Sequence, residues 1–298
     1  MESAEKTIYA PAKINLFLLI RDRRPDGYHE LESFMQKLDL ADEITVKLSE
    51  GEGVSLTCPD SDLPIDEGNL AWRAAQAFLE EASLECRIEL TLKKTIPVAA
   101  GLGGGSSDAA AVLLALNDLL GTRMSEERLA CLALKLGADV PFFVKDAPAA
   151  MARGVGERLE PVPPLAKCSI LLVNPGFAVP TSWVFDNFAL TSKGNPYILA
   201  PEKDYQSSIY SGSLIDTLDE AGPDVLFNDL ESVTVTRYPE IAAIKKKMLE
   251  DGAVASLMSG SGPTVFGIFT EEAAAAASYE LFRQQYGKKV VLTVPSHS

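Results

Sequence analysis

The chain has 298 residues, and 47% of them are hydrophobic, which is enough apolar material for one large domain or two smaller ones. Asp and Glu number 42 against 27 Lys and Arg, so the formal net charge is −15. An acidic surface repels nucleic acid and anionic lipid, which disfavours a nucleic-acid binder and a membrane-surface binder. A small anionic ligand is still compatible with this charge, because a few backbone N–H groups can hold a phosphate locally.

The cysteines and the hydropathy pattern indicate a reduced, soluble protein. The 4 cysteines lie far apart without a CxxC pair, and His29 and His297 are the only histidines, so a structural zinc site is not expected. No apolar run reaches the roughly 18 residues that a membrane span needs, and residues 1–7 do not resemble a signal peptide. We expect a protein of the bacterial cytoplasm, a monomer or a weak homodimer, that binds neither nucleic acid nor membranes.

The first predicted elements are strands. Residues 8–20 form an apolar-rich stretch interrupted by Lys13 and Asn15, which indicates a strand with an irregular entry. Further along, residues 44–48 alternate between apolar and polar side chains. A glycine-containing turn leads from them to the apolar residues 54–57, and this arrangement predicts a hairpin of two adjacent strands.

A helix and a strand precede the most informative part of the chain. Residues 70–82 have apolar side chains at helical spacing, behind Asn69 as a candidate N-cap. Residues 88–92 alternate in hydrophobicity and predict a strand that has ended by Pro97.

Two further helices are predicted after that strand. Residues 109–120 form an apolar helical pattern, with the side chains of residues 106–108 as candidate N-caps. Among these, Asp108 is expected to be a first-turn carboxylate that interacts favourably with the helix dipole. Residues 126–136 predict another helix, with Ser125 as its N-cap.

The second half of the chain has alternating strand and helix patterns behind a proline-rich stretch. Pro161, Pro163 and Pro164 mark a linker, so we place the domain boundary after residue 162. Beyond it, apolar periodicity predicts strands over 169–173, 265–269 and 290–294, and helices over 239–251 and 271–285. This pattern is typical of helices packed on a short sheet.

The strongest signal for a ligand is the segment 97–108, between a predicted strand and a predicted helix. Of the 5 residues 101–105, all but Leu102 are glycine. Glycine is favoured where φ is positive or where the backbone approaches a ligand closely. Successive N–H groups at a helix N-terminus form a cradle for an anion, most naturally a phosphate. The alternative is a tight strand-to-helix connection that binds nothing.

Neither of the two common phosphate-loop motifs matches this segment. A Walker loop requires GxxxxGK[ST], but Ser106 stands where the second glycine should be, and no Lys follows the glycines before Arg123. A dinucleotide fingerprint GxGxxG starting at Gly101 also requires glycine at position 106. These departures exclude a P-loop NTPase and a Rossmann-type site.

Three segments resemble those of the GHMP kinase family. Residues 97–108 have the family's PxxxGLGxxSS form, residues 10–16 are similar to its N-terminal motif, and residues 257–266 are similar to its C-terminal glycine-rich motif. The resemblance implies an α+β, two-domain GHMP kinase fold. Residues 1–162 would form a ribosomal-protein-S5-domain-2-like domain that binds ATP, and residues 163–298 a ferredoxin-like α/β sandwich on the substrate side.

Two more segments narrow the resemblance. Residues 25–29 (PDGYH) and 137–143 (GADVPFF) are similar to those of members that phosphorylate the 2-hydroxyl of 4-diphosphocytidyl-2-C-methyl-D-erythritol, or CDP-methylerythritol. That reaction yields the 2-phosphate and ADP, in the methylerythritol phosphate route to isoprenoid precursors. Homoserine, mevalonate and galactose kinases share the loop but are not expected to share the Asp-Gly-Tyr-His element.

The resemblance also implies roles for individual residues. Asp139 would accept the proton of the substrate hydroxyl, and Lys13 would keep Asp139 ionised. A Lys among apolar strand residues and an Asp before Val-Pro-Phe-Phe are costly to bury unless paired, which agrees with these roles and also with a purely structural ion pair. The implied ATP-binding residues are Pro97, Gly101, Leu102, Gly103, Gly104, Gly105, Ser106 and Ser107. For Mg²⁺, the candidate ligands are Ser106 and Ser107.

Substrate recognition is likewise implied by the resemblance. Tyr28 and His29 offer an aromatic face and a hydrogen-bonding ring, which a pyrimidine requires. Phe185 would form the opposing face, although an isolated phenylalanine is more typical of a core. The remaining implied substrate-binding residues are Asn15, Thr181, Gly260, Ser261 and Gly262.

Two other functions are compatible with these motifs. One is a GHMP kinase that acts on another small alcohol. The other is a non-catalytic member that binds a nucleotide as a regulator. Lys13 and Asp139 argue against the regulator, because phosphate binding alone does not require a base.

Overall fold

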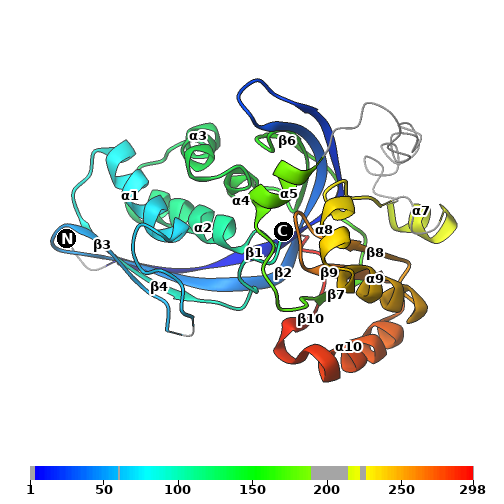
Figure 1. Cartoon of the computed structure of the whole chain (residues 1–298). Coiled ribbons are helices and arrows are strands. Elements are labelled where there is room, and N and C mark those ends of the chain that lie inside the picture. The colour runs from blue at the N-terminus through cyan, green and yellow to red at the C-terminus, as the bar shows by residue number, and fades with distance from the viewer. Residues whose placement is uncertain (1–3, 60, 189–213, 222–225, 298) are drawn as a thin grey trace. The chain divides into compact units, whose positions relative to one another are not determined.

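The chain forms two compact units. The structure is a computed structural model that describes residues 4–59, 61–188, 214–221 and 226–297 (Figure 1). Unit 1 comprises the described residues among 1–12, 40–98 and 103–146. Unit 2 comprises those among 13–39, 99–102 and 147–298. Because the chain passes from one unit to the other more than once, these units do not correspond to one cut of the chain, and the predicted boundary after residue 162 stays a prediction.

Two long paired strands contribute residues to both units. They are β1, Ala4–Arg23, and β2, His29–Ser49. The predicted strand over 8–20 is confirmed, and it is longer at both ends. The strand predicted over 44–48 is the last part of β2. Between β1 and β2 the chain turns at Gly27, whose φ of 90° lies in the left-handed region that glycine tolerates best.

Unit 1 also contains a group of four helices and two more strands. They are β3 Gly53–Thr57, α1 Leu70–Ala82, β4 Arg87–Lys93, α2 Gly104–Leu119, α3 Glu126–Leu136 and α4 Val140–Val144. The helices predicted over 70–82 and 126–136 are confirmed at both ends. Their N-caps form as expected, because the Asn69 side chain accepts a hydrogen bond from Ala71 N and Ser125 accepts one from Arg128 N.

The predicted hairpin between residues 44–48 and 54–57 is wrong. Both segments are strands, but β4 lies between them, antiparallel to the end of β2 and parallel to β3. The reason is the alternation within β4: Ile88, Leu90 and Leu92 are buried and extend the apolar face of β2. A local turn signal carries no information about a third strand that inserts between the two.

Unit 2 contains the first part of β2, which pairs with β5, and a second, four-stranded sheet. The further strands of this unit are β5 Ala149–Gly154, β6 Arg158–Pro161, β7 Ser169–Val173, β8 Ala255–Met258, β9 Val265–Phe269 and β10 Val290–Thr293. Its helices are α5 Thr181–Asn187, α7 Leu214–Ala221, α8 Glu231–Arg237, α9 Glu240–Glu250, α10 Glu272–Tyr286 and the 3-10 turn η3 Gly287–Lys289. The predicted strands and helices of the second half are confirmed, with ends shifted by a residue where they differ.

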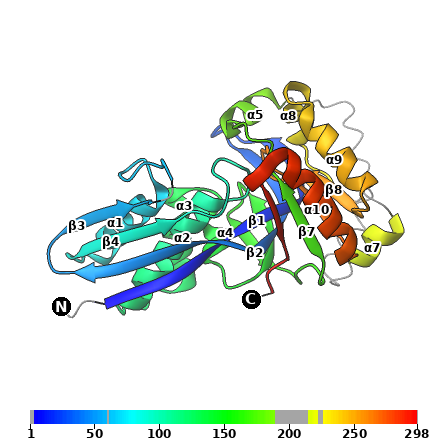
Figure 2. The ribbon, with the colours of Figure 1, turned by 90° about the horizontal axis from the view of Figure 1, so that it is seen from below.

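The second sheet has the order β10-β7-β9-β8, with neighbouring strands antiparallel. Helices α9 and α10 pack on it, as Figures 1 and 2 show. One apolar cluster joins helices and sheet, and it includes Met248, Val265, Phe269 and Phe282. Burial of such side chains contributes roughly 1.5–3 kcal/mol each, so this cluster stabilises the packing of the helices on the sheet. In the described parts of the chain, no helix is both long and apolar enough to cross a membrane.

Candidate active site

The first part of the glycine-rich loop, residues 99–102, is held within unit 2 from two directions. Lys13 N on β1 donates a hydrogen bond of 2.9 Å to the carbonyl oxygen of Leu102. The C-terminal glycine-rich segment supplies two more bonds: Ser259 Oγ donates to Gly101 O at 2.9 Å, and Thr264 N donates to Ala100 O at 3.3 Å. All three segments that resemble the family motifs therefore meet in this unit.

Close backbone approach explains the glycine at position 101. Its φ is 77°, and a Cβ atom added to it would lie 2.2 Å from the carbonyl oxygen of Ser259. Any side chain here would push the two glycine-rich segments apart. Gly260 is less crowded: its φ is 57°, and a Cβ atom on it would lie 3.3 Å from Gly101 O, with Asn15 Oδ1 at 3.4 Å and Lys13 Nζ at 3.5 Å, the last two at ordinary contact distances.

Lys13 and Asn15 form a buried polar chain on β1. Lys13 is 4% exposed and donates through Nζ to Asn15 Oδ1 at 2.6 Å. The Asn15 amide donates to Ser33 Oγ at 2.8 Å, and Ser33 Oγ donates to Phe17 O at 2.7 Å. This chain orients the ammonium group next to Gly260, which fits a cation that interacts with a bound anion.

Two of the aromatic residues predicted for the cytosine site, His29 and Phe185, also contact each other within unit 2. The rings of His29 and Phe185 are stacked, with centroids 5.2 Å apart. Burial lowers the pKa of His29 below 6.5, and the charge of Arg23 lowers it further, so the neutral imidazole is favoured at neutral pH. Tyr28 is 63% exposed beside this pair. On α5, the Thr181 hydroxyl shares a 2.8 Å hydrogen bond with Ser261 Oγ.

In unit 1, the second part of the loop begins helix α2 earlier than predicted. The helix starts at Gly104, and Gly103 is its N-cap residue with a φ of 72° and no side-chain cap. The predicted capping by residues 106–108 is therefore wrong. Because the helix has already begun, these residues lie inside its first turns, and both Ser107 and Asp108 are buried.

Asp108 belongs to a buried charge cluster that the sequence patterns did not reveal. Lys94 Nζ lies 2.8 Å from Asp108 Oδ2, and it also forms an ion pair with Asp42. Asp42 in turn accepts hydrogen bonds from Thr95 N and Ile96 N, at the start of the loop. Asp108 is therefore a partner of Lys94, rather than the simple first-turn carboxylate that we expected.

One ammonium in this cluster serves two carboxylates, which affects how the groups titrate. Burial raises the pKa of Asp108 to about 7; Lys94 opposes this shift, and the charge of Asp42 adds to it. Burial lowers the pKa of Lys94, but its ion pairs with Asp108 and Asp42 outweigh this, so the net shift is upward. We therefore expect Lys94 to stay charged while Asp108 exchanges a proton near neutral pH.

Two oxygens in the first turns of α2 have no hydrogen-bond partner among the described residues. They are Ser107 Oγ and Asp108 Oδ1, and both are buried. Buried oxygens of this kind are normally satisfied, so their position suits a ligand or cation that supplies the missing partner. Magnesium prefers oxygen ligands and takes few of them from protein, which fits this pair. No group of three or more His, Cys, Asp or Glu side chains suited to a metal occurs in the described ranges.

The remaining predicted residues of unit 1 are Asp139 and Pro97. Asp139 occupies the N-cap position of the short helix α4, but its side chain does not cap that helix. The helix is anchored by buried residues on all its turns, which fixes the backbone of Asp139. Pro97 is half-buried at the entrance of the glycine-rich loop.

Sequence reasoning missed two groups of residues around these segments. One is Lys94 with Asp42, where the available signal was a charged side chain next to an apolar strand. The other is the turn 228–231, whose Asn-Asp-Leu-Glu sequence places polar side chains before and at the start of α8. Neither group forms a recognisable motif, because each depends on residues far away in the chain.

Comparison with known proteins agrees with this arrangement. The model for the GHMP kinases N terminal domain matches residues 69–147, and the model for the GHMP kinases C terminal matches residues 213–288. A 4-diphosphocytidyl-2-C-methyl-D-erythritol kinase of Geobacter sp. strain M21 is 47% identical over 268 residues, covering 90% of this chain and 91% of that protein. The enzyme of the same name from Syntrophotalea carbinolica is 43% identical, covering 97% and 99%.

Solved structures give the same result. A 4-(cytidine 5'-diphospho)-2C-methyl-D-erythritol kinase superposes with a TM-score of 0.81 at 35% identity, covering 98% of this chain and 100% of that one. Homoserine kinase from Cytophaga hutchinsonii gives a TM-score of 0.77 at 22% identity, covering 100% and 95%, and therefore shares the fold. The predicted α+β, two-domain GHMP kinase fold is confirmed. With two matching family domains and relatives along nearly its whole length, this chain belongs to the GHMP kinase family and is an ATP-dependent kinase.

Proposed function

We propose that this kinase transfers the γ-phosphoryl group of ATP to the 2-hydroxyl of 4-diphosphocytidyl-2-C-methyl-D-erythritol, in the methylerythritol phosphate route to isoprenoid precursors. The observation that carries the proposal is the 47% identity, over 90% of this chain, to a protein named for that activity. The stacked pair of His29 and Phe185, whose ring planes are 30° apart, supports it, because an aromatic surface with a hydrogen-bonding edge suits a pyrimidine.

In the proposed reaction, the substrate hydroxyl oxygen attacks the γ-phosphorus and the bond to the β–γ bridging oxygen breaks. Asp139 accepts the hydroxyl proton, and ADP leaves with the bridging oxygen. Lys13 supplies positive charge for the transferring group. The support for Lys13 is its burial and its contact with Asn15 Oδ1, which together fix the direction of the ammonium.

For the nucleotide, we propose that the ATP phosphates bind along the glycine-rich loop and the start of α2. Gly101, Gly103, Gly104 and Gly105 leave the backbone N–H groups uncovered by side chains, and α2 adds the positive end of its dipole. Pro97 and Leu102 complete the proposed ATP-binding residues, together with Ser106 and Ser107.

Mg²⁺ is proposed to bind with the ATP. Ser107 Oγ would hold it, with Ser106 as the alternative, because the Ser107 oxygen is buried and has no partner among the described residues. When bound, Mg²⁺ neutralises part of the phosphate charge that builds up during transfer.

The substrate's other contacts are proposed within unit 2. Tyr28 would add to the cytosine site, and Asn15 and Thr181 would contact the substrate through polar groups. Gly260, Ser261 and Gly262 would hold its diphosphate through backbone N–H groups. We also propose that the enzyme acts in the bacterial cytoplasm, where its ATP is made, and the expectation of a monomer or a weak homodimer stays a prediction.

The test is ADP release from ATP and Mg²⁺ with one acceptor at a time: the cytidyl substrate, homoserine, mevalonate or galactose. We expect release only with the cytidyl substrate. Release with another alcohol would keep the kinase but remove the proposed cytosine site. Tight ATP binding without release on any acceptor would favour a regulatory protein instead.

A further inference from the structure

The turn that leads into helix α8 connects two of the segments described above. It consists of residues 228–231, Asn-Asp-Leu-Glu, and its three polar side chains each bond to a distant backbone group. Asn228 and Asp229 are buried, at 7% and 5% exposure. Polar side chains are buried at a cost unless they are satisfied, so their contacts indicate what this turn does.

Asn228 binds the C-terminal glycine-rich segment. Its amide nitrogen donates to the carbonyl oxygens of Met258 at 2.8 Å and Gly260 at 2.7 Å. Its own side-chain oxygen accepts from Leu230 N at 3.0 Å, which holds the side chain in place. The two N–H groups of the Asn228 side chain therefore hold the carbonyl of Met258, which comes before the Gly260–Gly262 segment, and the carbonyl of Gly260, which begins it. A side chain without this amide group would lose both bonds.

The same turn also fixes strand β1. Ile20 N donates to Asp229 Oδ2 at 2.7 Å, and Asp229 N donates to Leu18 O at 2.9 Å. Leu18 N in turn donates to Phe227 O at 2.9 Å. Lys13 and Asn15 lie earlier on β1, in the same unit. The turn 228–231 thus binds both β1, which carries Lys13, and the Gly260–Gly262 segment next to the Lys13 ammonium.

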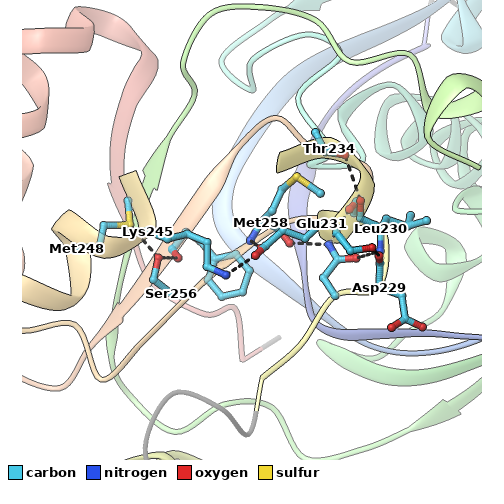
Figure 3. Close-up of polar contacts among 12 residues, drawn as sticks. Asp229, Leu230, Glu231, Thr234, Lys245, Met248, Ser256 and Met258 are labelled. Carbon is cyan, nitrogen blue, oxygen red and sulfur yellow. Dashed lines mark hydrogen bonds and ion pairs between the residues drawn. The ribbon is translucent and has the colours of Figure 1, made fainter. Parts of the chain in front are cut away.

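Glu231 adds a third connection, shown in Figure 3. Its Oε2 accepts a hydrogen bond of 2.9 Å from Met258 N, and its other oxygen forms an ion pair with Lys245 of α9. Thr234, one turn later on α8, donates through Oγ1 to Leu230 O at 3.2 Å. Met258 is therefore held through its N–H by Glu231 and through its carbonyl by Asn228.

We infer that Asn228 is a positioning residue for the Gly260–Gly262 segment, assisted by Glu231. The segment needs such support because Gly260 and Gly262 have φ values of 57° and 86°, and glycine is the residue with the most conformational freedom to lose. Asn228 acts through backbone carbonyls and not on the reacting groups. The inference rests on the proposed function, in which this segment holds the diphosphate of the acceptor substrate.

The test compares Asn228→Asp with a matched control, Asn117→Ala. The aspartate keeps an acceptor for Leu230 N and loses both donors. Asn117 also makes three hydrogen bonds to a turn, with Met124 O, Met124 N and Thr122 Oγ1, but it lies in unit 1. We expect Asn228→Asp to raise KM for the cytidyl substrate about 10-fold or more while KM for ATP changes less than about 3-fold, because misplacement of a binding group lowers its contribution steeply. Asn117→Ala should change neither KM.

Glu231 provides the second set of variants, which is informative even if Asn228→Asp does not fold. Glu231→Ala removes the acceptor for Met258 N and should raise KM for the acceptor about 3-fold. Glu231→Gln retains an acceptor oxygen and should restore KM to near the wild-type value. Amide hydrogen exchange at residues 258–262 should be faster in Asn228→Asp and Glu231→Ala, and unchanged in Asn117→Ala.

The outcomes separate this inference from the proposed function. If the wild type phosphorylates the cytidyl substrate and the Asn228 and Glu231 variants keep its KM, the inference is overturned and the function stands. If the wild type prefers another acceptor, the function is wrong, and the same KM comparison with that acceptor decides the inference. Equal KM changes in Asn228→Asp and Asn117→Ala would also overturn it, because they would reflect general destabilisation.

Discussion

The two parts of the glycine-rich loop are held by different kinds of interaction. Residues 99–102, in unit 2, are held by neutral hydrogen bonds to Lys13 N, Ser259 Oγ and Thr264 N. Residues 103–108, in unit 1, are held by the buried charges of Lys94 and its two carboxylate partners. One continuous loop is thus supported by neutral contacts over residues 99–102 and by an ion cluster over residues 103–108.

This difference matters if the loop binds the ATP phosphates, as we propose. Neutral hydrogen bonds do not titrate, so the geometry of residues 99–102 should be the same across a wide pH range. The ion cluster does titrate, since burial raises the pKa of Asp108 to about 7. Protonation of Asp108 reduces the negative charge beside the helix N-terminus, where a phosphate would otherwise be repelled. The two supports can be tested separately.

The largest effect is expected at Asp139, the proposed base. Asp139→Asn should lower kcat for ADP release about 10²–10⁴-fold, because the amide cannot accept the hydroxyl proton. Asp146→Asn is the matched control: it lies at the other end of α4, is exposed, and should leave kcat unchanged. Wild-type kcat in Asp139→Asn would remove Asp139 from the proposed mechanism.

The ion cluster should contribute strongly to the stability of unit 1. Lys94→Met leaves two buried carboxylates without their cation, and removal of one partner of a buried pair typically costs about 3–5 kcal/mol. The neighbouring Lys93 pairs with Glu43 at the surface, so Lys93→Met should cost about 0–1 kcal/mol. Denaturant unfolding measures both. Equal losses of unfolding free energy in the two variants would mean that the buried ion cluster stabilises the unit no more than a surface ion pair does.

The neutral support is most sensitive to close packing at Gly101. Gly101→Ala combines a positive φ with a Cβ atom 2.2 Å from Ser259 O, whereas Gly121→Ala has a φ of 60° and no atom within 4 Å. The control should lose about 1–2 kcal/mol of unfolding free energy from backbone strain alone. Gly101→Ala should lose about 1–3 kcal/mol more of unfolding free energy, because its Cβ atom overpacks the segment. It should also lose ATP-dependent activity. Equal losses would contradict the close approach of the two segments.

The buried charge cluster also predicts a pH dependence of stability. Because the pKa of Asp108 rises from 3.8 to about 7 on folding, the folded state binds this proton more tightly than the unfolded state. Its contribution to stability is therefore complete below pH 3.8 and is lost as the pH rises through about 7. As the pH rises across this window, the wild type should lose unfolding free energy relative to Asp108→Asn, which has no carboxyl group to titrate at this position. A difference that does not vary with pH would contradict the raised pKa.

The sequence predicted those features that depend on neighbouring residues. Helices α1 and α3 were predicted at both ends because Asn69 and Ser125 cap them locally. The hairpin prediction failed because β4, which separates β2 from β3, begins only at Arg87, well after the turn at residues 51–53. For α2, four glycines do not indicate which residue starts the helix, and the predicted caps, residues 106–108, lie inside it.

The candidate site shows the same division. The glycine-rich loop, Lys13 and Asp139 were found because they belong to local motifs. The Lys94 cluster was missed because its members, Asp42, Lys94 and Asp108, are distant in sequence and ordinary in composition. The contacts of Asn228 with Met258 and Gly260 are equally remote and could be identified only from the folded chain.

The most direct test of the account is phosphorus NMR of the product that the wild-type enzyme forms from ATP, Mg²⁺ and 4-diphosphocytidyl-2-C-methyl-D-erythritol. We predict a new phosphomonoester signal, coupled to the C2 position of the erythritol, with the cytidyl diphosphate signals retained and ADP formed in equal amount. ADP formation with inorganic phosphate and no phosphomonoester, or phosphate at another hydroxyl, would contradict the account.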